Sequence, residues 1–164
     1  MWQESGFIKD NSDIAIAMNR LAGHLLSVPE KFRKFTPAQL LEPSAPGKWC
    51  RQEILGHLID SAINNLKRFT DIQFLAQPYI VQSYKQDELV VVNNYAKLPL
   101  EHLLDLWQIL NRHIIFVVEN IPDEKLLIPV DPGYADGEMR TLGWVIADYV
   151  AHMEHHFLQI FGTE

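Results

Sequence analysis

Apolar residues recur at helical spacing in four separate stretches of the chain. Within each stretch they lie three or four positions apart, the repeat that places side chains on one face of an α-helix. In the first stretch, for example, Ile14, Met18, Leu21, Leu25 and Val28 form such a row. The four predicted helices cover residues 14–28, about 49–75, 99–122 and 141–162.

Residues that begin or end helices flank these stretches. Pro99 is favoured in the first turn of the third helix, and Pro122 ends it. Thr141 is a good N-cap for the fourth helix, and Gly162 is a natural C-terminal stop. Cys50 occupies the capping position of the second helix, where Ser or Thr would be usual. The boundaries therefore support four separate helices.

Two long connections join the helices. Residues 77–98 have no clean periodicity, and a second loop ends in VDPGYADGEMR. Neither contains a convincing alternating pattern of the kind that predicts strands. A connection as long as 77–98 is usually functional or needed to span the fold. We therefore predict an all-α four-helix bundle with two long connections, formed by residues 1–164 as one domain.

Charge and cysteine content narrow the classes of function. The net charge is −7 and the basic residues are scattered, so we expect neither nucleic acid nor a membrane surface as a partner. Cys50 is the only cysteine, which excludes an intramolecular disulfide and fits a reducing compartment. The N-terminal residues lack a signal-peptide layout, and apolar runs such as 114–118 are too short to span a bilayer. We expect a cytoplasmic protein.

Three histidines are the strongest candidate for chemistry. His152 and His156 lie four residues apart, which places both imidazoles on one helix face. With His57 from the second helix they offer three neutral nitrogen donors, enough to hold a divalent transition metal with one position open for catalysis. Alternatively, they form an ordinary hydrogen-bonded polar layer. The sequence does not show whether the second and fourth helices are neighbours, so both interpretations stand.

Several polar residues near these histidines have weaker claims. Asp60, His155 and Gln159 are candidates to orient metal ligands by hydrogen bonding, although Asp60 and His155 also suit an exposed position. Arg68 could anchor an anionic substrate if its helix face lines a cleft, and a solvated face is the alternative. No catalytic residue other than the histidines stands out, and Cys50 has no neighbouring histidine to act as its base. Three further histidines, at 24, 102 and 113, are expected to be structural.

Longer motifs resemble those of the DinB-like superfamily. The stretch PGKWCRQEILGHLIDSAINNLKRF is similar to that family's second helix, and TLGWVIADYVAHMEHHFLQI to its C-terminal metal helix. The intervening NYAKLPLEHLLDLWQILNRH resembles the middle region. The resemblance implies an up-down-down-up bundle, often a homodimer, with a divalent metal held by His57, His152 and His156. Zinc and nickel are the usual metals in that family.

The resemblance also implies a class of reaction. Some relatives transfer low-molecular-weight thiols such as bacillithiol or mycothiol onto electrophiles, and others isomerise substrates with the help of a thiol. We therefore expect a metal-dependent thiol S-transferase acting on a small molecule, or a related hydrolase. The alternative is a non-catalytic homodimeric module that binds metal without turnover. Cys50 departs from the Ser or Thr usual after the tryptophan, a change of capping strength rather than of chemistry.

Overall fold

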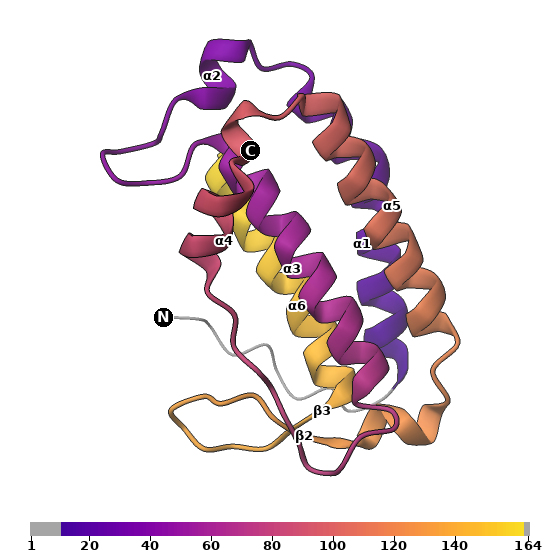
Figure 1. Ribbon diagram of the computed structural model, residues 1–164. Coiled ribbons are helices and arrows are strands. Elements are labelled where there is room, and N and C mark those ends of the chain that lie inside the picture. Colours follow the sequence, from indigo (N-terminus) through magenta and orange to yellow (C-terminus); the bar gives the residue numbers. More distant parts are fainter. Residues whose placement is uncertain (1–10, 163–164) are drawn as a thin grey trace.

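Four long helices form a bundle in the computed structural model, which describes residues 11–162 (Figure 1). The prediction of an all-α four-helix bundle is confirmed. The long helices are α1 (Asn11–Phe32), α3 (Arg51–Asp71), α5 (Leu100–Glu119) and α6 (Leu142–Phe161).

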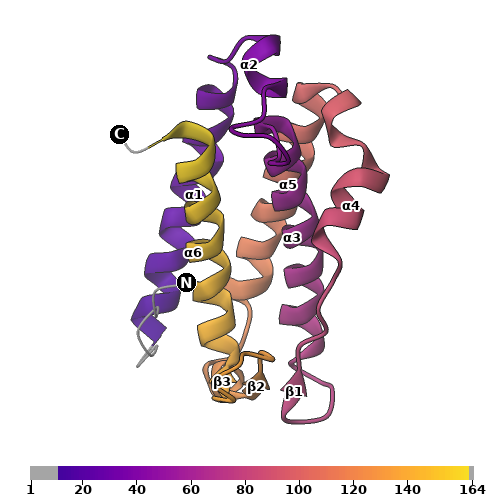
Figure 2. The same cartoon turned by 90° about the vertical axis from the view of Figure 1, so that its left-hand side faces the viewer.

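Each long helix packs against two of the others. Helix α3 contacts α5 and α6, and α1 contacts the same two helices from the opposite side. Helices α3 and α5 run in one direction and α1 and α6 in the other (Figures 1 and 2), which is compatible with the up-down-down-up topology. The second and fourth predicted helices, α3 and α6, are therefore neighbours. The sequence alone left that question open.

The connections contain short elements that the sequence did not predict. Their strands form a small sheet in which β2 (Pro129–Asp131) pairs parallel with β1 (Tyr79–Ile80) and antiparallel with β3 (Arg140–Thr141). Elements of two or three residues are too short to show a periodic pattern. The sequence does not predict helix α4 (Gln86–Asn93), because this helix buries only Val90 and exposes Val91 and Val92. The short elements are α2 (Pro37–Leu41), β1 (Tyr79–Ile80), α4 (Gln86–Asn93), the 3-10 helices η1 (Tyr95–Lys97) and η2 (Asp123–Leu127), β2 (Pro129–Asp131) and β3 (Arg140–Thr141).

The predicted helix boundaries are confirmed for α6 and for the start of α3, whereas α1 extends beyond the predicted 14–28 at both ends and α5 ends at Glu119, before Pro122. The Thr141 hydroxyl accepts a hydrogen bond from the Trp144 N–H at 3.2 Å, and Gly162 follows α6 with a φ of 81°. At the start of α3, the Glu53 carboxylate accepts from the Cys50 N–H at 2.8 Å. The end of α3 was predicted too late, because the chain leaves the helix at Asp71 and turns through residues 72–75.

The core lies along the bundle axis and includes the predicted apolar rows. One close approach fixes the 77–98 connection against α3: a Cβ at Gly56 would lie 2.1 Å from the Tyr95 ring, so only glycine lets the ring come this near. Within residues 11–162, no helix combines the length and the apolar character that crossing a membrane requires. The largest fully buried side chains include Phe32, Leu55, Phe69, Leu103, Trp107, Ile114 and Leu142.

Candidate metal centre and its cavity

Three imidazoles from α3 and α6 meet in the interior of the bundle. One ring nitrogen of each of His57, His152 and His156 lies within 4.8 Å of those of the other two. The His57 ring centroid lies 5.4 Å from that of His152 and 4.7 Å from that of His156, and the two α6 rings lie 4.6 Å apart. The structure thus brings together the three predicted ligands, although His57 precedes the other two by about a hundred residues in the chain.

His57 is the most deeply enclosed of the three. It has no exposed surface, and neither of its ring nitrogens has a hydrogen-bond partner among the described residues. A buried polar group without a partner costs on the order of 1–3 kcal/mol, so such groups are rare and need an explanation. The Trp49 ring, 5.0 Å away, offers an aromatic surface and no acceptor. A cation at the centre of the cluster would satisfy one of these nitrogens.

The surroundings keep the three imidazoles neutral. Burial, followed by repulsion from His156, lowers the pKa of His57 from 6.5 to about 4. Burial, with repulsion from the other histidines and from Arg68, lowers the pKa of His152 to about 3. Burial also lowers the pKa of His156. Near pH 7 all three are therefore neutral, the state in which imidazole binds a metal.

Gln159 orients one of the histidines. Its side-chain oxygen accepts a hydrogen bond from Nδ1 of His156 at 2.9 Å, which leaves the lone pair of Nε2 directed at His152, 3.2 Å away. The Gln159 amide nitrogen lies 3.2 Å from Nε2 of His155, which is exposed. Gln159 therefore stands where a residue that supports a metal ligand is expected, with His155 one step farther out.

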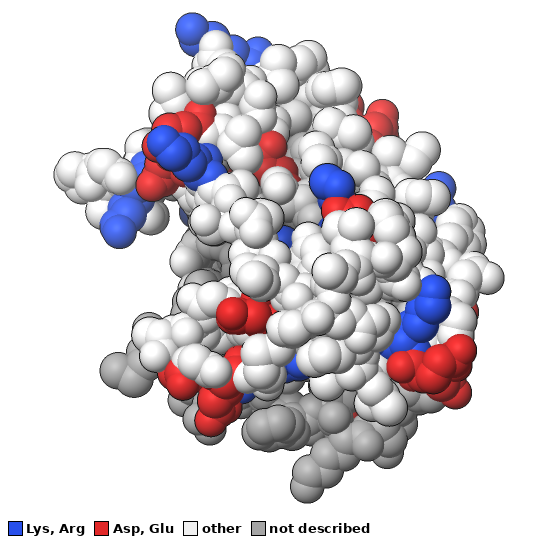
Figure 3. All heavy atoms as spheres, turned by 60° about the horizontal axis from the view of Figure 1, so that its bottom comes forward, with Lys and Arg blue, Asp and Glu red and all other residues white. Residues whose placement is uncertain are grey.

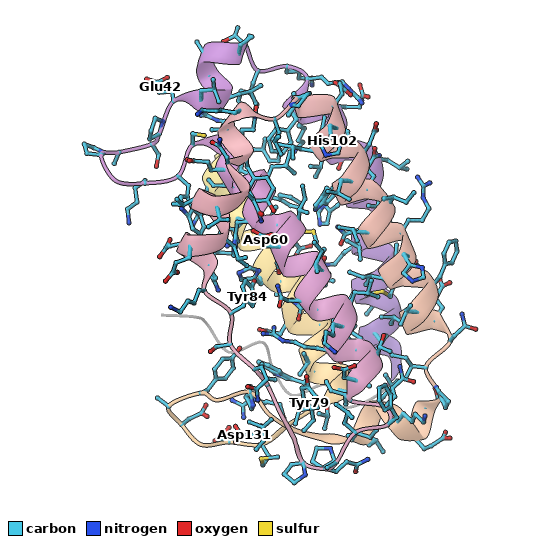
Figure 4. All side chains as sticks on the ribbon, in the orientation of Figure 1. Glu42, Asp60, Tyr79, Tyr84, His102 and Asp131 are labelled. Carbon is cyan, nitrogen blue, oxygen red and sulfur yellow. The ribbon has the colours of Figure 1, made fainter. Side chains whose placement is uncertain are left out.

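Asp60 is buried, but its hydrogen bonds lead away from the histidines. Its Oδ1 accepts from the Tyr95 hydroxyl at 2.6 Å and from the Asn93 amide at 3.2 Å. Burial raises the pKa of this carboxyl. These bonds hold the 77–98 connection against α3, and Figure 4 shows Asp60 on α3 and Tyr84 on that connection. The spacing in sequence places Asp60 near His57, but it does not show that the Asp60 carboxylate binds Tyr95 and Asn93 instead of a histidine.

A cavity of about 560 Å³ opens beside the histidines. The polar face of α3 and the histidine face of α6 form two of its walls. The 77–98 connection and the loop before β3 form the others, through residues such as Tyr84 and Tyr134. On the face shown in Figure 3, acidic and basic side chains are interspersed and much of the surface carries neither. The lining includes Ser61, Asn65, Arg68, Tyr84, Tyr134, Trp144, Asp148, His152, His155, His156 and Gln159.

The loop before β3 is the wall that the sequence did not predict. The Tyr134 hydroxyl donates to Asp148 at 3.3 Å, and the Tyr134 ring meets the Trp144 ring edge-on at 5.8 Å. Burial raises the pKa of Asp148. Nothing in the VDPGYADGEMR stretch indicates which helix it folds against, so its glycines predict a turn and no more. Arg68, by contrast, lies in the cavity as the hypothesis of an anion anchor requires.

The remaining histidines and Cys50 are not among the residues that line the cavity. His24 donates to the Glu154 carboxylate at 2.8 Å on the α1–α6 seam. His102 and His113 are exposed on α5, and Figure 4 shows His102 near the end of the bundle that carries α2. Burial raises the pKa of the Cys50 thiol, which opposes a nucleophilic role.

Comparisons with known proteins agree with the fold. The family model described as the DinB superfamily matches residues 24–160. Among solved structures, YfiT from Bacillus subtilis superposes with a TM-score of 0.74 at 21% identity, over 98% of this chain and 89% of that one. That protein is described as a probable metal-dependent hydrolase with an unusual four-helix bundle topology. A search of curated proteins finds no match.

Proposed function

The chain belongs to the DinB superfamily, and from this premise and the three-histidine cluster we propose that it is a metal-dependent enzyme. His57, His152 and His156 would hold a divalent cation, with zinc and nickel as the first ions to test. The observation that carries the proposal is the complete burial of His57 with both ring nitrogens unpartnered at the point where the other two imidazoles converge.

The donor set indicates what a metal would do there. A divalent cation bound by three neutral imidazoles keeps its full charge, and it supplies a reactive nucleophile near neutral pH by lowering the pKa of a bound water or thiol. His152 and His156 line the cavity directly, so a small molecule in it can approach them. Gln159 holds His156 in the tautomer that presents Nε2.

For the reaction itself we propose transfer of a low-molecular-weight thiol onto an electrophilic small molecule. The likeness to YfiT favours hydrolysis as the second candidate. In both cases the walls from the 77–98 connection and the loop before β3 would enclose the substrate. Exclusion of bulk water strengthens the electrostatic interactions in such a site.

Metal content is the primary test. Elemental analysis of tag-free protein should find close to one zinc or nickel per chain, and His57→Ala and His152→Ala should each abolish it. His102→Ala is the matched control, because that histidine is exposed on α5, and it should leave the metal content unchanged. Wild-type protein that holds no metal and takes up none when zinc or nickel is added contradicts the proposal.

Turnover assays then separate the two reactions. The metal-loaded protein is incubated with cysteine and 1-chloro-2,4-dinitrobenzene, and separately with p-nitrophenyl acetate in the absence of thiol. Thiol consumption that disappears in His57→Ala supports transfer, whereas ester cleavage that disappears in the same variant supports hydrolysis. Stoichiometric metal without either activity favours the non-catalytic binding module.

A further inference from the structure

Arg68 brings a positive charge into the cavity and forms no salt bridge with a carboxylate of the described residues. Its side chain is partly buried, and it donates to the Gln82 backbone oxygen at 2.8 Å and to the Asn65 side-chain oxygen at 3.3 Å. The Tyr84 ring lies 5.6 Å from the guanidinium carbon. Every one of these partners is neutral, and Arg68 forms no ion pair with any residue from 11 to 162. Its other N–H groups remain available to an acceptor in the cavity.

Three other arginines are paired with carboxylates: Arg20 with Glu154, Arg33 with Glu30 and Glu101, and Arg140 with Asp136 and Glu138. Arg51 resembles Arg68 in having neutral partners, two backbone oxygens and the Phe35 ring, but it is not among the residues that line the cavity. Arg68 instead lies in the wall of a cavity and is held in place by a backbone carbonyl, an amide and an aromatic ring. A fixed guanidinium with unused donors is suited to bind a carboxylate through two parallel hydrogen bonds.

Arg68 lies on the same helix as His57, in the α3 wall of the cavity, whereas His152 and His156 line the α6 wall. Arg68 follows His57 by eleven residues on α3, three helical turns, so the two side chains project from nearly the same face about 16 Å apart along the axis. Ser61 and Asn65 lie between them and line the same cavity.

We propose that the substrate carries a carboxylate, which Arg68 binds at the end of the cavity away from the histidines. A single negative charge fits better than a phosphate dianion, because the Asp148 carboxyl lines the same cavity and repels a dianion more strongly than a monoanion. This inference rests on the proposed function only for the reaction at the histidine end. Binding of the carboxylate itself does not require the metal.

The test uses probes that differ only in charge. Ligand-observed NMR on metal-free protein compares hexanoate with 1-hexanol for wild type, Arg68→Met and Arg68→Lys. Wild type should bind hexanoate about tenfold more tightly than the alcohol, as expected for a charge-assisted hydrogen-bonded pair. Arg68→Met keeps an apolar side chain of similar reach and should lose that preference, and Arg68→Lys should retain part of it. Equal affinity for the two probes in wild type, or a preference that persists in Arg68→Met, overturns the inference.

A second measurement connects the two ends of the cavity. Cobalt-loaded protein is titrated with mercaptocarboxylates from mercaptoacetate to 8-mercaptooctanoate and with the matching mercaptoalcohols, and thiolate–cobalt absorption is recorded. The acids should gain affinity over the alcohols only above the chain length that reaches Arg68, and this gain should vanish in Arg68→Met. A gain that is the same at every chain length contradicts the placement of the carboxylate. Failure of cobalt to bind contradicts the proposed metal centre and leaves the hexanoate result standing.

Discussion

The histidines of this bundle lie in two contrasting settings. One is a clamp on the α1–α6 seam that contains His24, and the other is the three-histidine cluster between α3 and α6. On the α1–α6 seam, His24 donates to Glu154, which also accepts from Arg20, so every charge in this clamp has a partner. Between α3 and α6, His57 has no hydrogen-bond partner among the described residues, and its ring contacts are the Trp49 indole and the other two imidazoles. The clamp is complete within the protein itself. In the cluster the ring nitrogens of His57 are left without hydrogen-bond partners among the described residues, and that difference is the strongest argument that the cluster binds a cation.

The largest effect that separates the two groups is stabilisation by metal. Zinc at about a thousand times its Kd should raise the free energy of unfolding by about 4 kcal/mol, a Tm increase on the order of 10 °C, because it binds only the folded cluster. Thermal unfolding with and without zinc or a chelator measures this shift. His57→Ala should abolish the shift and His24→Ala should preserve it. An equal zinc shift in His57→Ala would show that the metal binds elsewhere.

Acid should destabilise the metal-free protein through the cluster before it affects the clamp. His57 binds protons less readily in the folded chain, with a pKa of about 4 against 6.5 ordinarily. Stability is therefore complete above pH 6.5 and falls as the pH drops from 6.5 to 4, with His57 alone contributing a loss of about 3 kcal/mol. Urea unfolding of metal-free protein between pH 7.5 and 4 measures the slope.

The matched variant for this experiment is His57→Phe, which keeps a ring at the position and cannot be protonated. Its stability should fall less steeply than that of wild type between pH 6.5 and 4. Identical slopes for the two proteins would mean that the imidazole does not resist protonation in the folded state.

The sequence predicts the position of the histidines on their helices but not the partners that distinguish the clamp from the cluster. Local features of the sequence are confirmed: α6 begins after the Thr141 cap, ends before Gly162, and carries His152 and His156 four residues apart. The hydrogen-bond partner of a histidine depends on the tertiary structure, because Glu154 lies 130 residues from His24 in the sequence. No periodicity could show that His24 has a carboxylate and that His57 has none.

The cavity walls illustrate the same limit. Arg68 lines the cavity, as its predicted role of anion anchor requires, and Ser61 and Asn65 of the same helix line it as well. Tyr134 reaches it from a loop whose sequence indicates a turn without specifying its position in space. The direction of Asp60 toward Tyr95 depends on the place of the 77–98 connection, which Gly56 and the Tyr95 ring determine by close packing.

A smaller effect should follow from Gln159, which supports the cluster without belonging to it. Gln159→Met retains length but cannot accept the Nδ1 proton of His156, so the ring loses its fixed tautomer and orientation. Zinc Kd should rise about tenfold, at the lower end of what loss of such a contact costs. Gln159→Glu keeps an acceptor and should restore most of the affinity. Competition with a chromophoric chelator measures Kd, and an unchanged value in Gln159→Met would show that the contact does not support metal binding.

The smallest effect is expected at the clamp, where Glu154→Gln removes the charge from an already complete set. Burial raises the pKa of Glu154, but the hydrogen bonds from His24 and Arg20 outweigh it and lower the pKa to about 2. Because the pair is partly exposed, the variant should lose only about 1 kcal/mol at neutral pH. That contribution is present above pH 4.5 and is lost as the pH falls toward 2, a range below that of the histidines. Denaturant unfolding and zinc titration of the same variant provide the check. Reduced stability with unchanged zinc Kd places the clamp in the scaffold, whereas a weakened Kd would mean that α1 and α6 transmit the loss to the cluster and that the two groups are not independent.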